Sequence, residues 1–316
     1  MNKNGPRQVT LIEVGPRDGF QFEARPITTD LKVEVVTGLI RAGLTHLQVV
    51  SFVHPNRVPQ MADAEALLKR LPQGRKIHYH GLVLNARGLA RAMATGLRAV
   101  EISISASDTH SRRNTNLTFP EALEKGCRMV RTAKKNGLYV RAGAQCALGC
   151  AFEGAVAPER VTDILTRFRD LGADAVVVSD TTGMGSPLSL QRLLDRLQPA
   201  VAPLPVILHL HDTRGTGLVN MLTGLDYGIA HFDTSLGGMG GCPFIPGAAG
   251  NIPTEDAAYL LNTLGIATGI DIRQVAECAR KLESAIGRQL PGKMLRVLET
   301  ASDATGSHHG PPKRDV

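Results

Sequence analysis

Eight short apolar runs alternate with longer helical patterns along almost the whole chain of 316 residues. Several runs, such as AVVVSD at 175–180 and VILHLH at 206–211, are nearly continuous and rich in β-branched residues. Such runs are typical of parallel strands whose sheet is covered by helices on both faces. The eight predicted strands are Val9–Val14, Leu47–Ser51, Ile77–Val83, Val100–Ser105, Tyr139–Gln145, Ala175–Asp180, Val206–His211 and His231–Ser235.

The segments between these runs have the spacing of amphipathic helices. One of them begins with the capping-box pattern Thr118-Phe-Pro-Glu121 and ends at Asn136-Gly137, so both of its ends are marked. The other predicted helices are Asp30–Ala42, Asp63–Arg70, Leu89–Thr95, Pro158–Leu171, Pro187–Leu197, Leu218–Tyr227 and Thr254–Leu264. A glycine stands where several of these helices should end: Gly43, Gly96, Gly137, Gly172, Gly228 and Gly265.

Eight consecutive strand–helix units close most economically into an α/β barrel of the (β/α)8 or TIM type. A doubly wound open sheet is the structural alternative that the pattern leaves open. After Leu264 the pattern changes: Asp271–Ile286 predicts one more helix, and Met294–Thr300 a further turn. We therefore expect a single domain over residues 1–300, with additional C-terminal helices, and a flexible polar tail over 301–316.

The charge and the aromatic content narrow the classes of partner. The net charge is +7, but Lys and Arg are scattered along the chain, and aromatic residues make up only 4% with no Trp. A nucleic-acid-binding protein would instead cluster its basic residues and offer aromatic stacking surfaces. The positive charge therefore favours a small molecule that carries phosphate, such as a coenzyme A (CoA) thioester, and argues against nucleic acid.

Three further features predict a soluble cytoplasmic protein without membrane association. The opening residues MNKNGPRQ are polar, and no apolar segment of the kind that a secretory signal needs follows them. No apolar run approaches the roughly 20 residues that cross a membrane. The five cysteines are too few and too scattered for the disulfide framework of a secreted protein.

Polar residues that can bind a metal follow three of the predicted strands. In a barrel of this type the active site lies at the carboxyl ends of the strands. Asp18 follows the first strand, His209 and His211 lie two apart on the seventh, and Asn251 follows the eighth. Residues two apart on a strand point to the same face, so both imidazoles should face the barrel mouth with the Asp18 carboxylate. Such a mixed nitrogen and oxygen site favours Mg²⁺ or Mn²⁺, with Zn²⁺ or Co²⁺ as substitutes.

Alone, two histidines at this spacing are more often structural than metal-binding, and the adjacent Arg17 and Asp18 are what favour a metal site. Arg17 itself has two interpretations: a surface ion pair, or a fixed cation that stabilises the enolate formed when a carbon–carbon bond next to a thioester breaks. Cys242 lies in a glycine-rich stretch over residues 237–250, which is typical of a mobile loop. Its thiol is either inert or a general acid.

Several stretches that carry these residues resemble the 3-hydroxy-3-methylglutaryl-CoA (HMG-CoA) lyase family of metal-dependent barrel lyases. They occur in order and at family-like spacing: EVGPRDGFQFE (13–23), SFVHPNRVPQMAD (51–63), RRNTN (112–116), CALGCAFEG (146–154), DTTGMG (180–185), HLHDTRG (209–215) and GGMGGCPFIPGAAGNIPTED (237–256). The resemblance implies a lyase that cleaves a 3-hydroxyacyl-CoA thioester to acetyl-CoA and a keto acid, which is acetoacetate when the substrate is HMG-CoA. It also implies a role in leucine catabolism and a homo-oligomer such as a dimer.

The resemblance assigns roles residue by residue. The metal ligands fall on Asp18, His209, His211 and Asn251, the catalytic arginine on Arg17 and the cysteine of the mobile loop on Cys242. The polar positions that the family uses around the substrate fall on Gln21, Ser51, Arg141, Asp180 and Glu255. In the retro-Claisen cleavage that this implies, Asp18 or a hydroxide at the metal is the base, Arg17 stabilises the enolate and Cys242 is the proton donor.

Two positions depart from the family pattern. Gln48 stands at the second strand where the family usually carries a glutamate, and Val177 stands on the sixth strand where it usually carries a serine. We expect Gln48 to remain a substrate-binding residue, although the lost carboxylate removes an anion that would orient Arg17. The substrate therefore stays open between HMG-CoA and another 3-hydroxyacyl-CoA. The remaining alternatives are a related Claisen-type acyltransferase or aldolase, and a non-catalytic barrel that binds CoA or metal.

Overall fold

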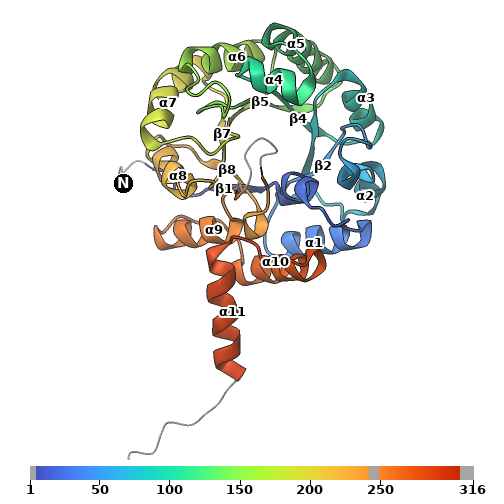
Figure 1. Cartoon of the computed structure of the whole chain (residues 1–316), viewed down its shortest axis with the longest axis vertical. Helices are drawn as coiled ribbons and strands as arrows, with labels where there is room; N and C mark the ends of the chain where they lie inside the picture. The colour runs from blue at the N-terminus through green and yellow to red at the C-terminus, as the bar shows by residue number, and fades with distance from the viewer. Residues whose placement is uncertain (1–4, 242–248, 307–316) are drawn as a thin grey trace, which may run out of the picture.

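Eight parallel strands close into a barrel in the order in which they occur along the chain (Figure 1). The computed structural model describes residues 5–241 and 249–306. The strands are β1 Thr10–Glu13, β2 His46–Ser51, β3 His78–Val83, β4 Ala99–Ser105, β5 Tyr139–Gln145, β6 Ala175–Asp180, β7 Val206–Leu210 and β8 His231–Thr234. Because β8 pairs with β1, with Thr10 opposite His231, the prediction of a (β/α)8 barrel is confirmed and the open sheet is excluded.

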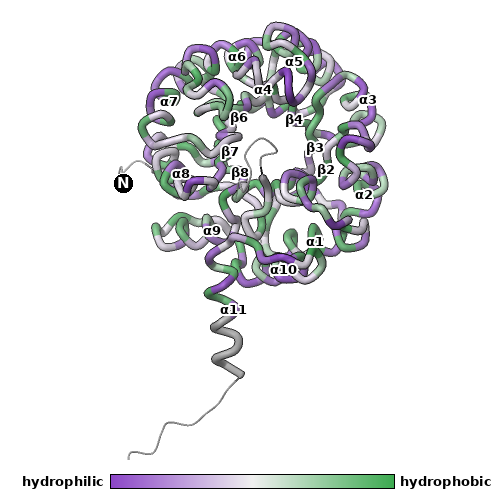
Figure 2. The backbone as a smooth tube through the Cα atoms, viewed as in Figure 1, coloured by the Kyte–Doolittle hydropathy of each residue, from purple (hydrophilic) through white to green (hydrophobic). Residues whose placement is uncertain are grey.

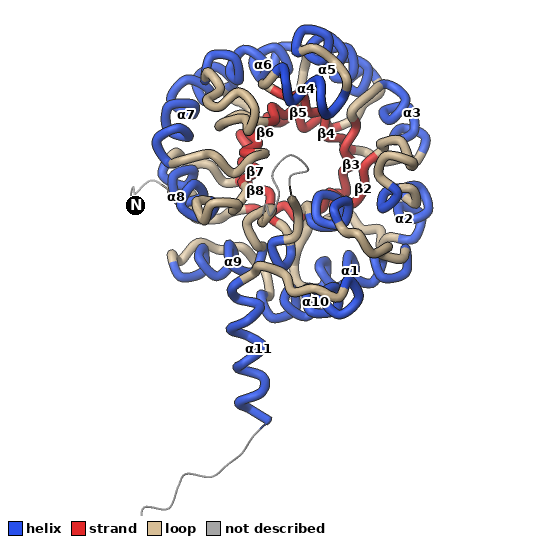
Figure 3. The backbone as a smooth tube through the Cα atoms, in the orientation of Figure 1, coloured by secondary structure: helices blue, strands red, loops and turns tan. Residues whose placement is uncertain are grey.

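Most of the helices lie outside the ring of strands (Figure 3). They are α1 Thr29–Arg41, α2 Ala64–Arg70, α3 Ala86–Ala94, α4 Asp108–Thr115, α5 Phe119–Lys135, α6 Pro158–Asp170, α7 Pro187–Val201, α8 Gly217–Asp226, α9 Thr254–Thr263, α10 Ile272–Ile286 and α11 Lys293–Gly306. Short helical turns lie in the connections: η1 Gly15–Gly19, η2 Phe20–Phe22, η3 Pro59–Met61 and η4 Leu236–Gly238. Every predicted helix forms, with ends that differ from the prediction by a few residues.

The local sequence explains where α5 begins and ends. The Thr118 hydroxyl accepts from the Glu121 backbone N–H, and the Glu121 carboxylate accepts from the Thr118 N–H, so the predicted capping box is formed. At the other end Gly137 has a φ of +75°, a conformation that favours glycine. The helix therefore occupies the interval between these two signals.

Helix α4 is absent from the sequence-based prediction because its residues, DTHSRRNT, are almost all polar and carry no hydrophobic period. The Ser107 hydroxyl caps it by accepting from the His110 backbone N–H at 3.1 Å. The helix is followed by Asn116, whose φ of +58° is left-handed. It lies beside α5 at the barrel mouth (Figure 1), so its capping rather than an apolar face defines it.

The hydrophobic core has two parts. The larger part fills the space between the barrel and the helices, along which hydrophobic and hydrophilic residues alternate (Figure 2). The smaller part is a separate cluster inside the barrel, made by side chains of β1, β6 and β7 and of the residue after β1: Ile12, Val14, Ala175, Val177 and Ile207. The other strands direct polar or charged side chains inward, where they are buried: Gln48, His80, Glu101, Arg141 and Asp233. The barrel interior therefore has an apolar side and a polar side.

Two helices follow the barrel. Helix α10 packs against α1 and α9, and α11 begins where the Asp256 carboxylate accepts from the backbone N–H groups of its first two residues. Helix α11 extends away from the barrel (Figure 1) and runs to Gly306, so it is longer than the turn predicted over Met294–Thr300. The flexible tail and the domain limit at residue 300 stay predictions. None of the described helices is long and apolar enough to cross a membrane.

Candidate functional site

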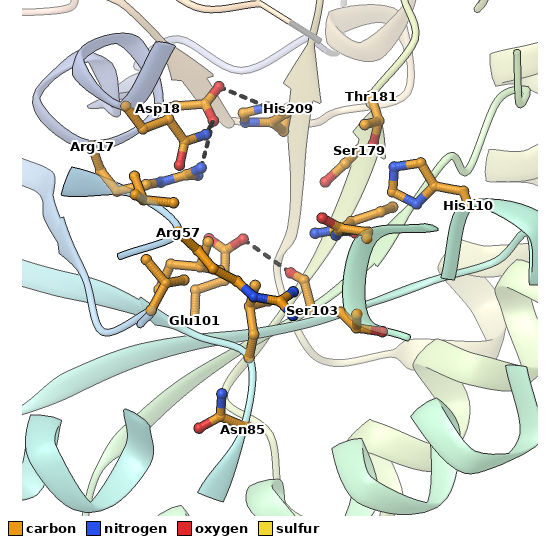
Figure 4. A pocket seen from close by; sticks show the side chains of 18 of the residues that line it. Arg17, Asp18, Arg57, Asn85, Glu101, Ser103, His110, Ser179, Thr181 and His209 are labelled. Atoms are coloured by element: carbon orange, nitrogen blue, oxygen red, sulfur yellow. Dashed lines mark hydrogen bonds and ion pairs between the residues drawn. The ribbon is translucent and has the colours of Figure 1, made fainter. Parts of the chain in front are cut away.

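A cavity of about 530 Å³ opens at the carboxyl ends of the strands. Five of the residues singled out from the sequence line it: Arg17, Asp18, Gln21, His209 and His211. The other polar residues of the wall are ones for which the sequence suggested no role: His54, Arg57, Asn85, Glu101, Ser103, His110, Asn114, Thr115, Lys125, Gln145, Ser179 and Thr181. Figure 4 shows Arg17, Asp18 and His209 together on one side of the cavity. On another side Glu101 accepts a hydrogen bond from Ser103.

A single π-helical turn, η1, presents Arg17 and Asp18 to the cavity. It follows β1 closely, and the Val14 carbonyl accepts from the backbone N–H groups of Arg17 and Asp18, at 3.0 and 2.7 Å. Such turns are rare and occur often at functional sites. At the start of the turn the Gly15 N–H donates to the Glu13 carboxylate at 2.8 Å. A Cβ atom at Gly15 would lie within 3.0 Å of the Glu13 carboxylate and of the Leu236 and Ser235 side chains, so these neighbours would have to shift.

Asp18, His209 and His211 form a buried group arranged to hold a metal ion, the one such group found within the described residues. The Asp18 Oδ2 atom lies 3.8 Å from the Nε2 atom of each imidazole, and the two Nε2 atoms are 3.2 Å apart. Two imidazole nitrogens and a carboxylate oxygen that converge in this way fit a divalent cation.

Asp233, on β8, sets the orientation of His209. Its Oδ2 atom lies 3.2 Å from His209 Nδ1, so that nitrogen donates to the carboxylate and Nε2 keeps its lone pair for a metal. Arg141 in turn donates to both Asp233 oxygens, at 2.7 and 2.8 Å. The sequence analysis missed Asp233. The signal that marks it is an acidic residue inside the strand HFDT.

Asn251 is placed to complete the group. Its Nδ2 atom donates to Asp18 Oδ2 at 2.7 Å and to the Met239 carbonyl at 3.1 Å. Its Oδ1 atom is buried and has no hydrogen-bond partner in the described part of the chain. A buried amide oxygen without a partner costs free energy unless something binds it, and hard divalent cations prefer oxygen ligands. The residues present therefore fit a metal ion with Asn251 included.

The surrounding charges keep Asp18 ionised. Burial alone would raise the pKa of Asp18, but the Arg17 guanidinium and the two imidazoles outweigh it and hold that pKa well below its usual range. Burial lowers the pKa of His211. At His209 burial also acts to lower the pKa, but the hydrogen bond to Asp233 and the negative charges of Asp18 and Asp233 together outweigh it, and the pKa is raised. Asp18 is therefore an anion at neutral pH, which suits a metal ligand better than a general base.

Two glutamines hold Arg17 and Asp18. Gln21 Nε2 donates to Asp18 Oδ1 at 3.0 Å, and Arg17 Nε donates to Gln48 Oε1. Of the predicted substrate-binding residues, Arg17 and Gln21 line the cavity. The others are buried and are not among the described residues of its wall: Gln48, Ser51, Arg141, Asp180 and Glu255. Cys242 lies outside the described residues. Substrate contact by any of these residues stays a prediction.

Asp180 and Glu255 stabilise loops near the mouth. Asp180 accepts from the Met184 and Gly185 backbone N–H groups, and burial raises its pKa to about 6. Glu255, at the start of α9, accepts from the Gly237 N–H at 3.0 Å, and burial raises its pKa to about 8. Both carboxyl groups therefore act on the backbone of segments that lead to or from the site.

Comparison with known families decides the classification. The family model described as HMGL-like matches residues 8–282. The chain belongs to the HMGL-like family. The resemblance inferred from the sequence motifs is therefore confirmed.

Relatives of this HMGL-like protein carry the names of lyases. The cytoplasmic 3-hydroxy-3-methylglutaryl-CoA lyase of Rattus norvegicus is 36% identical over 92% of this chain and 85% of its own length. A hydroxymethylglutaryl-CoA lyase of Bacillus subtilis is 36% identical over 94% of this chain and 99% of its own.

Solved structures agree with the classification of this HMGL-like protein. The hydroxymethylglutaryl-CoA lyase of Pseudomonas aeruginosa has a TM-score of 0.91 at 34% identity, over 94% of this chain and 99% of its own. An HMG-CoA lyase of Acinetobacter baumannii, solved with coenzyme A and 3-methylmalate, has a TM-score of 0.88 at 31% identity, over 96% and 98%. The likeness therefore covers nearly the whole of both partners.

Proposed function

We propose that this protein is a divalent-metal-dependent lyase that cleaves HMG-CoA to acetyl-CoA and acetoacetate. The observation that carries the proposal is the grouping of Asp18, His209 and His211 beside Arg17 on the wall of one cavity. A metal-binding group and a fixed cation meet there, and retro-Claisen cleavage uses both. The HMGL-like family match and the relatives named as HMG-CoA lyases support the same reaction.

Asp18, His209, His211 and Asn251 would hold the metal ion. Mg²⁺ or Mn²⁺ suits the carboxylate and amide oxygens best, and the two imidazoles also admit Zn²⁺ or Co²⁺. When bound, such an ion supplies Lewis acidity toward the 3-hydroxyl oxygen of the substrate. The chain contributes the orientation of these ligands, because Asp233 fixes the His209 ring and Asn251 donates to Asp18.

Arg17 is the residue placed to act on the thioester. In the proposed cleavage the 3-hydroxyl gives its proton to a hydroxide ion, which becomes water, because Asp18 suits a metal ligand better than a base. The bond between the second and third acyl carbons then breaks, and its electron pair moves onto the thioester as an enolate. The Arg17 guanidinium is buried and held by Gln48 and Asp18, so it meets the enolate oxygen without reorganising. We keep Cys242 as the donor of the proton that the second acyl carbon then takes up.

A CoA thioester is the substrate class that suits the cavity. Arg57 and Lys125 lie on its wall and offer positive charge to phosphate groups. The relative solved with coenzyme A supports the same class. We also propose a homo-oligomer such as a dimer, as the resemblance implies, and a cytoplasmic location, in line with the relatives named as cytoplasmic.

Another 3-hydroxyacyl-CoA is the second candidate substrate, because the cavity wall carries polar groups besides the catalytic ones. Glu101, Ser103 and Ser179 all line the cavity. Polar side chains on the wall favour an acyl chain that brings its own hydrogen-bonding groups, because they can bind such groups and gain nothing from a plain alkyl chain.

A panel of 3-hydroxyacyl-CoA thioesters, assayed for acetyl-CoA release with and without Mg²⁺ or Mn²⁺, tests both candidates. We expect cleavage of HMG-CoA, its loss on chelation and its return when metal is restored. No turnover of any thioester by the metal-loaded protein would leave only a binding role.

The metal site has its own test. His209→Ala should lower the amount of bound metal, because it removes one of the four proposed ligands. The matched control is His78→Ala, at the amino end of β3, which should leave the metal content as it is. Equal metal content in the two variants would remove His209 from the ligand set.

A further inference from the structure

We propose that Glu101 is a positioning residue, which orients Arg17 toward the substrate through the side chain of Gln48. Glu101 lies on β4, Gln48 on β2 and Arg17 on the turn after β1, so the three come from separate parts of the chain. The inference rests on the proposed function in one respect, because it takes Arg17 as the residue that meets the thioester.

The Gln48 amide has only one orientation that satisfies both of its neighbours. Arg17 Nε is a donor and never an acceptor, so it requires the Gln48 oxygen. The Gln48 nitrogen then donates to Glu101 Oε2 at 2.9 Å, and an ionised carboxylate can only accept. Gln48 is fully buried, so water does not compete for either group. A flipped amide would oppose donor to donor and acceptor to acceptor.

Two further groups hold Glu101 in place. The Ser103 hydroxyl donates to Glu101 Oε1 at 3.0 Å, and Arg141 Nη2 lies 3.1 Å from Glu101 Oε2. Glu101 is 5% exposed and lies on the cavity wall (Figure 4). A buried carboxylate is tolerated when it is paired and hydrogen-bonded in this way. Because Arg141 also binds Asp233, the same network reaches the carboxylate that orients His209.

Arg17 is thereby held at two points. Gln48 fixes its Nε atom and Asp18 fixes its Nη1 atom, and two such contacts define the plane of the guanidinium. Its Nη2 atom makes no hydrogen bond with the described residues, and Arg17 lines the cavity. The network therefore leaves this nitrogen to meet a developing negative charge, in a geometry that is set before the substrate binds.

Exchanging the two side chains tests this chain of hydrogen bonds. Gln48→Glu alone sets two carboxylates against each other, and we expect kcat/KM to fall by about 100-fold. Glu101→Gln alone removes the charge that fixes the amide, and we expect a fall of about tenfold. In the double variant the new carboxylate accepts from Arg17, and the new amide donates to that carboxylate while it accepts from Ser103. The new amide nitrogen also faces Arg141, which loses its contact with residue 101 and keeps Asp233. We therefore expect kcat/KM of the double variant within about tenfold of the wild type, well above the roughly 1000-fold loss that independent effects would give.

The two single effects cancel in the double variant only if the side chains act on each other. Effects that multiply would overturn the proposal. The matched control is Glu65→Gln, which also removes a carboxylate bound to an arginine, Arg91, but away from the cavity. It should leave kcat/KM unchanged.

The orientation of Arg17 also has a readout that needs no turnover. In protein labelled with ¹⁵N-arginine, the Nε–H signal that disappears in Arg17→Lys belongs to Arg17. It should exchange slowly with water in the wild type and in the double variant, and faster in both single variants. Protein that follows this pattern but cleaves no thioester would refute the proposed function alone. Active protein whose signal is the same in all variants would refute the positioning role alone.

Discussion

The two sides of the barrel interior differ in chemistry, although the same alternation of strand residues builds both. On the side of β1, β6 and β7 the buried inward side chains include a closed apolar cluster. On the side of β2 to β5 and β8 they are polar. Hydrogen bonds and one ion pair, between Glu101 and Arg141, connect them from Arg17 to His209. Packing alone stabilises the first side, whereas the second also orients two parts of the candidate site.

Ile12 and Asp233 allow the two sides to be compared directly, because they are paired in the register of β1 and β8 and both are buried. One belongs to the apolar cluster, and the other binds Arg141 and His209. Truncation of each to alanine should therefore separate what stabilises the barrel from what orients the metal ligands.

The largest effect is expected for Asp233→Ala. The substitution leaves Arg141 with Glu101 as its one remaining carboxylate partner in the described barrel interior, and we expect a loss of about 4 kcal/mol in the free energy of unfolding. It also frees the His209 ring, which should weaken metal binding by about 10- to 100-fold. Urea unfolding and metal titration measure the two effects. Metal affinity equal to that of the wild type would show that Asp233 does not orient His209.

Arg17→Lys tests the other end of the polar network. Lysine keeps the charge but loses the planar group that Gln48 and Asp18 hold, so we expect kcat/KM to fall by about 1000-fold. Metal content should stay as it is, because Arg17 is not a ligand. Near-normal turnover in this variant would end the assignment of Arg17 as the stabilising cation.

The barrel itself could be predicted from the sequence because each strand and helix carries its own local signal. The continuous run at Ala175–Asp180 and the capping box at Thr118 are read without knowing what lies next to them in space. His209 and His211 could be paired for the same reason, since the strand period alone puts them on one face.

The polar side of the interior could not be predicted, because its contacts join residues far apart in the chain. Glu101 is recognisable as unusual because it is an acidic residue within the apolar run of β4. The local sequence, however, does not indicate that it contacts Gln48, which lies 53 positions earlier. Gln48 lacks the carboxylate that the family usually has at this position, and the Glu101 carboxylate beside it supplies one instead. Val177, which stands where the family usually carries a serine, lies in the apolar cluster and is not among the described residues of the cavity wall.

Ile12→Ala is the counterpart of the Asp233 substitution. It leaves a cavity in the apolar cluster, and we expect a loss of about 3 kcal/mol in the free energy of unfolding. Metal affinity and kcat/KM should stay near the wild-type values at temperatures where the variant is folded. A loss of metal affinity comparable to that of Asp233→Ala would mean that the apolar side also contributes to the orientation of the metal ligands.

The smallest effect is expected for Glu255, which belongs to neither side of the barrel interior. Its carboxyl group accepts from the backbone N–H of Gly237, at the start of the glycine-rich stretch. Burial raises its pKa from 4.5 to about 8, so the folded protein keeps a proton there that the unfolded chain releases above pH 4.5. This contribution to stability is complete below about pH 4.5 and is lost as the pH rises toward 8. The free energy of unfolding should therefore fall as the pH rises across this window. We expect a fall of roughly 2 kcal/mol, which is less than the full pKa difference would give, because water and local relaxation reduce the cost of ionising a buried group.

Glu255→Gln cannot ionise, so its free energy of unfolding should vary less between pH 5 and pH 8 than that of the wild type. Urea unfolding at a series of pH values measures the slope. Ile12→Ala is the control, because it should lower stability by a similar amount at every pH and keep the wild-type slope. An unchanged slope in Glu255→Gln would mean that the Glu255 carboxyl is already ionised in the folded protein, held by the Gly237 N–H despite its burial.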